Sequence, residues 1–260
     1  MNAELAGTAG RRSTRLLAAV LLSAVLGTGA AACGSGTTAG RPADAAASAD
    51  PLARLSAGQI FNRAVGDLRT TSAVRVTGNV TSTGQHIRLD LTLLNGARCK
   101  GSISLQGKGS FRLIMIGKTV WIKPDRKFWT TFGGTNSAAL HILAGKYLRL
   151  SARGNGNSLG SLAALCKPGK LAGSFGGISS AATATRPHVT VAGQPALRLS
   201  ARDGKGSDSL EVSDSATPEI LRIAGTGSTV ADIKFIGYGH TVPLTAPPAS
   251  QTLSGKRFGL

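Results

Sequence analysis

The side chains in this chain that could carry chemistry are its cysteines, histidines and carboxylates. The cysteines are Cys33, Cys99 and Cys166, and no two of them form a CxxC metal-binding motif. The histidines are scattered without ligand spacing: His86, His141, His188 and His240. We therefore expect no metal site and no cofactor.

The sequence also shows no arrangement typical of an enzyme. It has no GxSxG motif and no glycine-rich phosphate loop ending in Lys-Ser or Lys-Thr. The glycines of residues 154–156 lack the flanking strand and helix of a dinucleotide fingerprint. His86 and Asp90 fall on one expected strand, where we interpret each as a solvated outer-face residue rather than as half of a catalytic pair. We expect a protein that is not an enzyme.

Cys33 stands at the end of a targeting segment. Arginines precede an apolar run at residues 16–26, which is shorter than the roughly 20 residues that span a bilayer, and small residues follow at 29–32. The ending resembles a bacterial lipobox, although Ala30 stands where leucine is usual. This resemblance implies that Cys33 carries a diacylglyceryl group, with palmitate as a typical acyl chain, and becomes the new N-terminus. The alternative is an ordinary signal peptide with a chance cysteine.

With Cys33 assigned to lipidation, Cys99 and Cys166 remain as an even pair. Outside the cytoplasm such a pair favours one disulfide bond. The loop it would close is long enough for the chain-entropy model to give roughly 4 kcal/mol of stabilisation. The alternative is two separate buried thiols.

The chain carries a formal charge of +18 from 30 basic and 12 acidic residues. Removing the predicted signal takes away three arginines and one glutamate, so the exported part keeps +16. Such a charge suggests an anionic partner. Export argues against nucleic acid, and so does an aromatic content of 4%, which offers no stacking platform. Anionic lipid and anionic envelope polymers remain as candidates.

Composition divides the chain into four parts. Residues 1–32 are the predicted lipoprotein signal peptide, and residues 33–51, rich in Gly, Ala, Ser and Pro, form a flexible tether. Residues 52–244 form one domain, of a size that is common for a single unit. Residues 245–260 are an extended C-terminal tail.

Within the domain, Ser56 and Gln59 have the spacing of a capping box, and apolar residues then follow helical periodicity to Leu68. Alternation with period two predicts strands near residues 74–77, 87–94, 102–105, 111–116 and 120–123, separated by turn residues. This pattern favours an antiparallel meander with one apolar face, covered on that side only. The residues that we place on that face are Leu89, Leu91, Leu93, Ile103, Leu105, Phe111, Leu113, Met115, Val120 and Ile122.

Cys99 has the same strand parity as Ile103, so we expect it to point to the apolar face. Cys166 follows a helix-like stretch at residues 158–165, within a region, 135–175, that reads as helical in pieces. A disulfide bond would therefore attach this helix to the sheet. Strands resume at residues 189–191, 197–199, 210–212, 220–223 and 233–235. The order helix, strands, helices, strands predicts an α+β fold with helices on one face of an antiparallel sheet.

Several stretches together resemble the LppX/LprG-like lipoproteins of actinobacteria, which are similar in fold to the carrier LolA. The matching segments span residues 52–248 and include SAVRVTG (72–78), LDLTLLNGARCKGSISL (89–105), VWIKPDRKFW (120–129), VTVAGQPALRLSA (189–201) and IKFIGYGHTVPLTAPP (233–248). Phe235 and Tyr238 keep a family pattern, with Ile236-Gly237 where Ser-Asp is usual. The resemblance implies a strongly curved half-barrel sheet with helices on its concave face and an apolar cavity for acyl chains between them.

Two functions follow as hypotheses. The first is a monomeric lipoprotein on the outer face of the cytoplasmic membrane that binds, carries or presents acylated lipids or glycolipids. The ten apolar-face residues would then line its cavity, or else simply form the core beneath the helices. The second is a basic surface module that binds anionic envelope polymers, headgroups or a partner protein, without lipid cargo.

Overall fold

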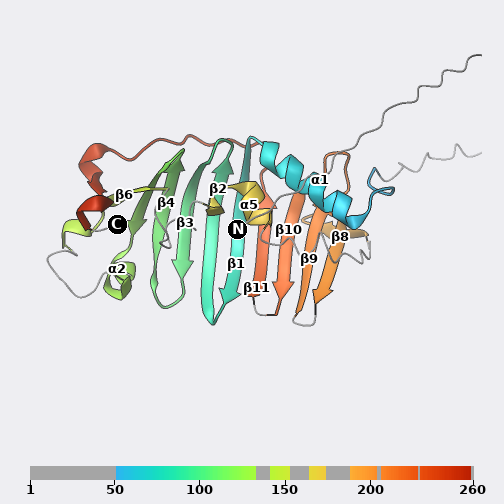
Figure 1. Ribbon diagram of the computed structural model, residues 1–260, viewed down its shortest axis with the longest axis horizontal. Helices are drawn as coiled ribbons and strands as arrows, with labels where there is room; N and C mark the ends of the chain where they lie inside the picture. Colours follow the sequence, from blue (N-terminus) through green and yellow to red (C-terminus); the bar gives the residue numbers. More distant parts are fainter. Residues whose placement is uncertain are drawn as a thin grey trace, which may run out of the picture. The chain divides into compact units, whose positions relative to one another are not determined.

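The computed structural model describes residues 51–132, 141–152, 164–173, 188–203, 206–227 and 229–258. The elements in these ranges form one large sheet with a few helices (Figure 1). The signal, the lipidation site Cys33 and the tether up to residue 50 lie outside the described residues, so those assignments stay predictions. None of the helices in the described ranges combines the length and hydropathy needed to cross a bilayer.

Helix α1, Ala57–Thr70, begins where its sequence signals place it. The Ser56 side chain accepts a hydrogen bond from the Gln59 amide at 3.2 Å, and the Gln59 side chain accepts one from the Ser56 amide at 2.8 Å. This confirms the capping box, which satisfies two amides that a helix start otherwise leaves free. The buried side of the helix carries the predicted apolar stripe: Ala57, Ile60, Phe61, Ala64, Val65 and Leu68.

The sheet has twelve strands in the order β12-β6-β5-β4-β3-β2-β1-β11-β10-β9-β8-β7. All neighbours are antiparallel except β12 and β6, which are parallel. The strands of the first half are β1 (Ala73–Ser82), β2 (Gln85–Leu94), β3 (Arg98–Leu105), β4 (Gly109–Ile116), β5 (Thr119–Pro124) and β6 (Tyr147–Ser151). Those of the second half are β7 (His188–Val191), β8 (Gln194–Asp203), β9 (Gly206–Ser213), β10 (Ile220–Thr226) and β11 (Thr229–Ile236), and β12 (Thr252–Ser254) follows near the end of the chain.

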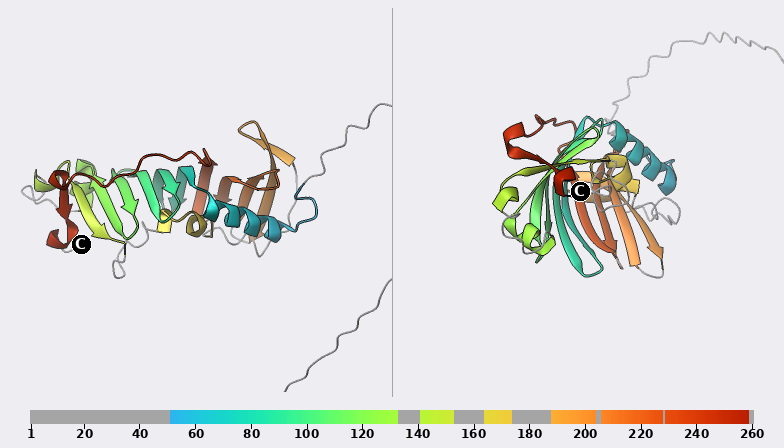
Figure 2. Two further views of the ribbon diagram at one scale, coloured as in Figure 1. Left: turned by 90° about the horizontal axis from the view of Figure 1, so that it is seen from above. Right: turned by 60° about the vertical axis from the view of Figure 1, so that its left-hand side comes forward.

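Two antiparallel meanders thus meet where β1 pairs with β11. The strands curve and the sheet stays open, with β12 at one edge and β7 at the other (Figures 1 and 2). The predicted meander, its strands and its one apolar face are confirmed. At the central seam, Gly78 is required by close approach, because a Cβ atom there would collide with the backbone oxygen of Asp232.

The two faces of the sheet carry different elements. Helices α1 and α5 (Pro168–Gly173) lie on one side, and the segment after β11 runs along the other (Figure 2, left). On that second side the Lys100 ammonium donates to the Pro243 carbonyl at 2.9 Å. Trp121, whose strand parity also places it there, is only 9% exposed. The expectation that the sheet is covered on one side only is therefore wrong at β3 and β5, where the polar face is also covered.

The structure also corrects one element. The sequence predicts helices in pieces over residues 135–175, but Tyr147–Ser151 forms β6, which pairs with β5. Leu148 and Leu150 are buried and their neighbours are half-buried or exposed, so a two-residue period is present, but over five residues only. A run that short does not separate strand from helix. Most of the helix-like stretch 158–165 lies outside the described residues.

The remaining helices are short. Helix α2, Arg126–Phe132, follows β5 directly and packs beside β4. The Asp125 carboxylate caps it by accepting the Phe128 amide at 2.7 Å. Two 3-10 turns, η1 (Ala249–Gln251) and η2 (Gly255–Phe258), flank β12 near the end of the chain.

Candidate functional site

The ten residues predicted for the apolar face do come together in the structure. Nine of them are at most 6% exposed, and Leu105 is half-buried and packs against the same cluster. The alternation of β2 to β5 brings them there, because successive side chains of a strand point to opposite faces. The result is one continuous aliphatic surface across four strands, joined to the stripe of α1 in a single core. Of the ten, Phe111 also lines a pocket described below.

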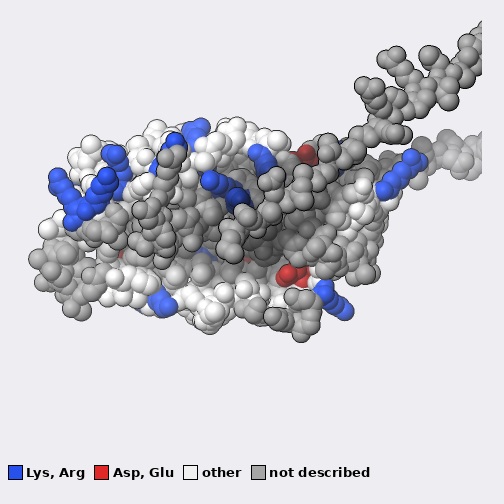
Figure 3. All heavy atoms as spheres, viewed as in Figure 1, with Lys and Arg blue, Asp and Glu red and all other residues white. Residues whose placement is uncertain are grey.

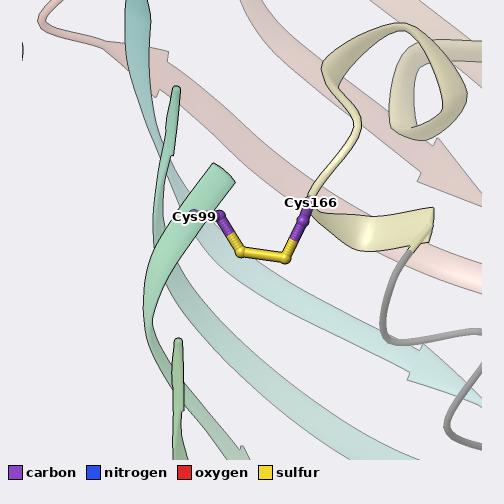
Figure 4. Close-up of a disulfide and its surroundings, with 2 residues drawn as sticks. All are labelled: Cys99 and Cys166. Atoms are coloured by element: carbon purple, nitrogen blue, oxygen red, sulfur yellow. A yellow bond between two sulfur atoms is a disulfide. The ribbon is translucent and has the colours of Figure 1, made fainter. Parts of the chain in front are cut away.

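Cys99 and Cys166 form the predicted disulfide bond, with their Cα atoms 5.4 Å apart (Figure 4). Both cysteines are fully buried. Cys99 lies on β3 directly between Leu93 of β2 and Met115 of β4, so the bond reaches the middle of the apolar face, as its parity predicted. Cys166 stands just before α5, so the disulfide attaches this segment to the sheet.

The residues that could have formed a catalytic pair have separate partners. The Thr81 hydroxyl and the His86 Nδ1 atom share a hydrogen bond of 2.7 Å. The Arg75 guanidinium donates two bonds to Asp90, at 2.8 and 2.7 Å, and this bonding holds the pKa of Asp90 below its ordinary value. Within the described ranges, no three His, Cys, Asp or Glu side chains gather as metal ligands would.

The polar face carries a row of side chains in register. Directly paired positions run without interruption across nine strands, from β8 to β5. In spatial order they are Arg198, Glu211, Arg222, Lys234, Thr77, Asp90, Ser102, Arg112 and Lys123. The acids in this row all lie on its β8 to β2 side, and the β4–β5 end is purely cationic.

At the β8 end of the row the charges are paired. Arg198 donates two bonds to one oxygen of Glu211, at 3.0 and 2.7 Å, and Glu211 is only 3% exposed. Arg222 donates to both oxygens of Asp232, which lowers the pKa of that carboxyl. The pocket of about 700 Å³ that these residues help to line is therefore largely neutralised by its own ion pairs.

At the cationic end lies a second pocket, of about 610 Å³. It is beside the end of β5, because β6 pairs with β5 only as far as Ile122 and leaves the last two residues of β5 unpaired on that side. Its lining combines four basic side chains, three serines, one carboxylate and a small apolar group: Arg112, Lys123, Arg126, His141, Ser102, Ser104, Ser110, Asp125, Phe111, Pro124, Trp129, Ala144 and Gly145.

Asp125 fixes the wall of this second pocket. Its carboxylate accepts the Ser110 amide at 2.8 Å and the Ser110 hydroxyl at 2.7 Å, besides the Phe128 amide of α2. Burial pushes the pKa of Asp125 upward, but these hydrogen bonds outweigh burial and hold that pKa below its usual value. The carboxylate thus ties the start of β4 to the start of α2.

Sequence patterns did not identify this pocket in advance. One signal for it was present, since the two-residue turn Gly117-Lys118 sets the β4–β5 register and so places Arg112 opposite Lys123. The contributions of α2 and of the segment that carries His141 come from tertiary packing. Lys and Arg also gather over the β6 end of the sheet, on the described part of the surface shown in Figure 3.

No protein-family model and no curated protein matches this chain. Among solved structures, it is similar to the MucA/MucB complex structure from Pseudomonas aeruginosa, with 14% identity over 75% of this chain and a TM-score of 0.36. The chain spans 59% of the length of that matched chain. It is also similar to a DUF1329 family protein from Desulfovibrio piger, with 7% identity, 73% and 95% of the two chains covered, and a TM-score of 0.28. Likenesses this weak assign neither a family nor a function.

Proposed function

We propose that this chain is a lipid-anchored extracytoplasmic protein that holds acyl chains against the apolar face of its sheet, without catalysing a reaction on them. The observation that carries the proposal is the chemistry of that face. From β2 to β5 it presents aliphatic side chains, two buried aromatic or thioether groups, Phe111 and Met115, and no charged residue. Such a surface offers a ligand no hydrogen bonds and suits a hydrocarbon chain.

Two features of the sequence support the rest of the proposal. The lipobox-like end of the predicted signal supports an anchor at Cys33 and a place on the outer face of the cytoplasmic membrane. The resemblance to LppX/LprG-like lipoproteins, and through them to LolA, supports a half-barrel whose concave side holds the helices and an acylated lipid or glycolipid. The disulfide bond at Cys99 would keep one covering segment in place while others move apart to admit the ligand.

Native mass spectrometry of residues 34–260, which lack Cys33 and so carry no covalent lipid, tests this proposal after gentle purification from the protein's own cells. We expect an added mass that matches a lipid. In Met115→Trp the larger side chain should occupy the space of the acyl chain, so the added mass should fall while the free energy of unfolding stays within about 1 kcal/mol of wild type. Ile114→Trp, one residue along β4 and on the other face, is the matched control and should retain the lipid.

A filled core gives the opposite result. Residues 34–260 would then carry no added mass, and Met115→Trp would overpack the core and lose roughly 1–3 kcal/mol of stability. That combination would overturn the proposal.

The alternative function, a basic surface module for anionic partners, is favoured by one observation, the cationic end of the row on the polar face. The two functions use opposite faces of one sheet and are compatible. Salt separates them, because attraction between exposed charges weakens as ionic strength rises, whereas retention of an acyl chain does not.

A further inference from the structure

The pocket beside the end of β5 differs from the rest of the polar face in having cations without counter-ions. Arg112, Lys123 and Arg126 make no ion pair within the described residues. The carboxylate of the pocket, Asp125, accepts hydrogen bonds from two backbone amides and one hydroxyl instead. The Lys123 ammonium lies 5.3 Å from the centre of the Tyr147 ring, a contact that orients the cation without neutralising it.

The register makes this arrangement unfavourable in the free protein. Arg112 and Lys123 are directly opposite each other on neighbouring strands, and like charges in that position destabilise a sheet. Elsewhere on the polar face the sheet places an acid opposite or diagonal to each of three arginines, Arg75, Arg198 and Arg222. An anion bound between Arg112 and Lys123 would remove this repulsion.

Trp129 lines the same pocket and is 8% exposed. Its indole Nε1 is enclosed and has no hydrogen-bond partner among the described residues, so this nitrogen does not open into the pocket. The indole is therefore part of the wall of the site and not a donor to a ligand. Ser102 and Ser104, on the polar face, add hydroxyl donors to the lining.

We infer that this pocket binds a phosphate group through Arg112, Lys123 and Arg126, with the hydroxyls of Ser102 and Ser104 as further donors. A phosphate carries up to two charges and three strong acceptor oxygens, which matches three cations better than a carboxylate does. The volume of about 610 Å³ is that of a site for an organic molecule, so the phosphate is part of a larger ligand. The apolar wall of Phe111 and Pro124 would contact that remainder.

This inference does not depend on acyl-chain binding, because the three cations and the serines of the site lie outside the apolar surface. It is tested first with inorganic phosphate. The chain has two tryptophans, so Trp121→Phe leaves Trp129 as the single reporter inside the pocket. We expect saturable change of its emission with phosphate and none with chloride at equal ionic strength.

Charge-matched variants locate the binding. Arg112→Gln and Lys123→Gln should each raise the Kd for phosphate about tenfold, the size of one lost charge-assisted hydrogen bond. Lys118→Gln in the β4–β5 turn and Arg63→Gln on the exposed side of α1 remove the same charge outside the pocket and should change the Kd by less than about twofold. Arg126→Gln, on α2, serves if a strand variant fails to fold.

Vesicles identify the source of the phosphate. If the wild-type protein sediments with phosphatidylglycerol vesicles and not with phosphatidylcholine vesicles, and if Arg112→Gln loses this sedimentation, the ligand is a lipid headgroup. If sedimentation is unchanged while the titration is weakened, the ligand is a soluble phosphate compound. Absence of a saturable phosphate response, or equal weakening by the two control variants, overturns the inference.

Discussion

Removing the disulfide bond should cost this protein a large part of its stability. Cys99 and Cys166 are separated by 67 residues. For a loop of that length, the chain-entropy model gives about 4 kcal/mol at 25 °C. Domains of this kind have total stabilities of about 5–15 kcal/mol. The bond therefore accounts for a quarter or more of the margin that keeps the domain folded.

A double-mutant cycle separates the cross-link from simple packing. Each of Cys99→Ala and Cys166→Ala breaks the bond and removes one fully buried sulfur, worth about 1 kcal/mol of packing. We expect each single variant to lose about 5 kcal/mol and the double variant about 6, so the coupling between the two sites is about 4 kcal/mol. Equilibrium urea unfolding followed by tryptophan fluorescence measures all four proteins.

Additive losses would refute this reasoning. If the single variants lose about 1 kcal/mol each and the double variant about 2, the cross-link contributes nothing beyond the packing of two sulfur atoms. Lipid exchange gives a second measurement on the same proteins. If acyl chains bind beneath the segment that Cys166 holds, the double variant should release them faster than wild type.

Three further predictions concern the sheet itself. Glu211→Gln removes the charge of a carboxylate that is 3% exposed and should lower the free energy of unfolding by about 2 kcal/mol. Asp90→Asn, in an exposed ion pair, should lower it by at most about 1 kcal/mol. Urea titrations at pH 7 compare the two variants. Gly78→Ala should lower the free energy of unfolding by about 3 kcal/mol, because the added Cβ clashes with the neighbouring strand. Gly66→Ala on α1, where an added Cβ meets nothing, should raise it by about 0.5–1 kcal/mol, and thermal unfolding measures both variants. The pKa of Asp232 is lowered, first by the hydrogen bond from Arg222. Its contribution to the free energy of unfolding is therefore complete above the unfolded pKa of about 4 and is lost as pH falls through the lower folded value. Stability measured from pH 7 to pH 3 should fall less steeply in Asp232→Asn than in wild type, and an unchanged slope would contradict this.

Local signals predicted much of this fold. The capping box at Ser56 and a 3.6-residue period defined α1, and a two-residue period defined β1 to β5. In strands that alternate so regularly, parity decides the face of each residue, which is why the position of Cys99 could be read from its distance to Ile103. The disulfide bond followed from parity and from the even number of remaining cysteines.

Other features depend on contacts between distant segments, and the sequence carries little signal for those. The pairing of β1 with β11 joins residues more than 140 positions apart. The burial of Glu211 depends on its two sheet neighbours, and β12 has three residues, too few for a period. The pocket beside β5 depends on three features. The β4–β5 register could be predicted from the turn that joins the two strands. The packing of α2 and the point where β6 stops pairing with β5 could not be predicted from it.

The strand order has a consequence for how the chain assembles during synthesis. β1 lies in the middle of the finished sheet, but its second neighbour, β11, begins 147 residues after β1 ends. At roughly 5–20 residues per second, the ribosome takes about 7–30 s to make those residues. During that time β1 is an edge strand with bare amides and carbonyls, which can pair with another nascent copy. A chain released before Ile236 would keep that edge permanently, so premature termination anywhere between the two meanders should yield aggregates rather than a half-size domain.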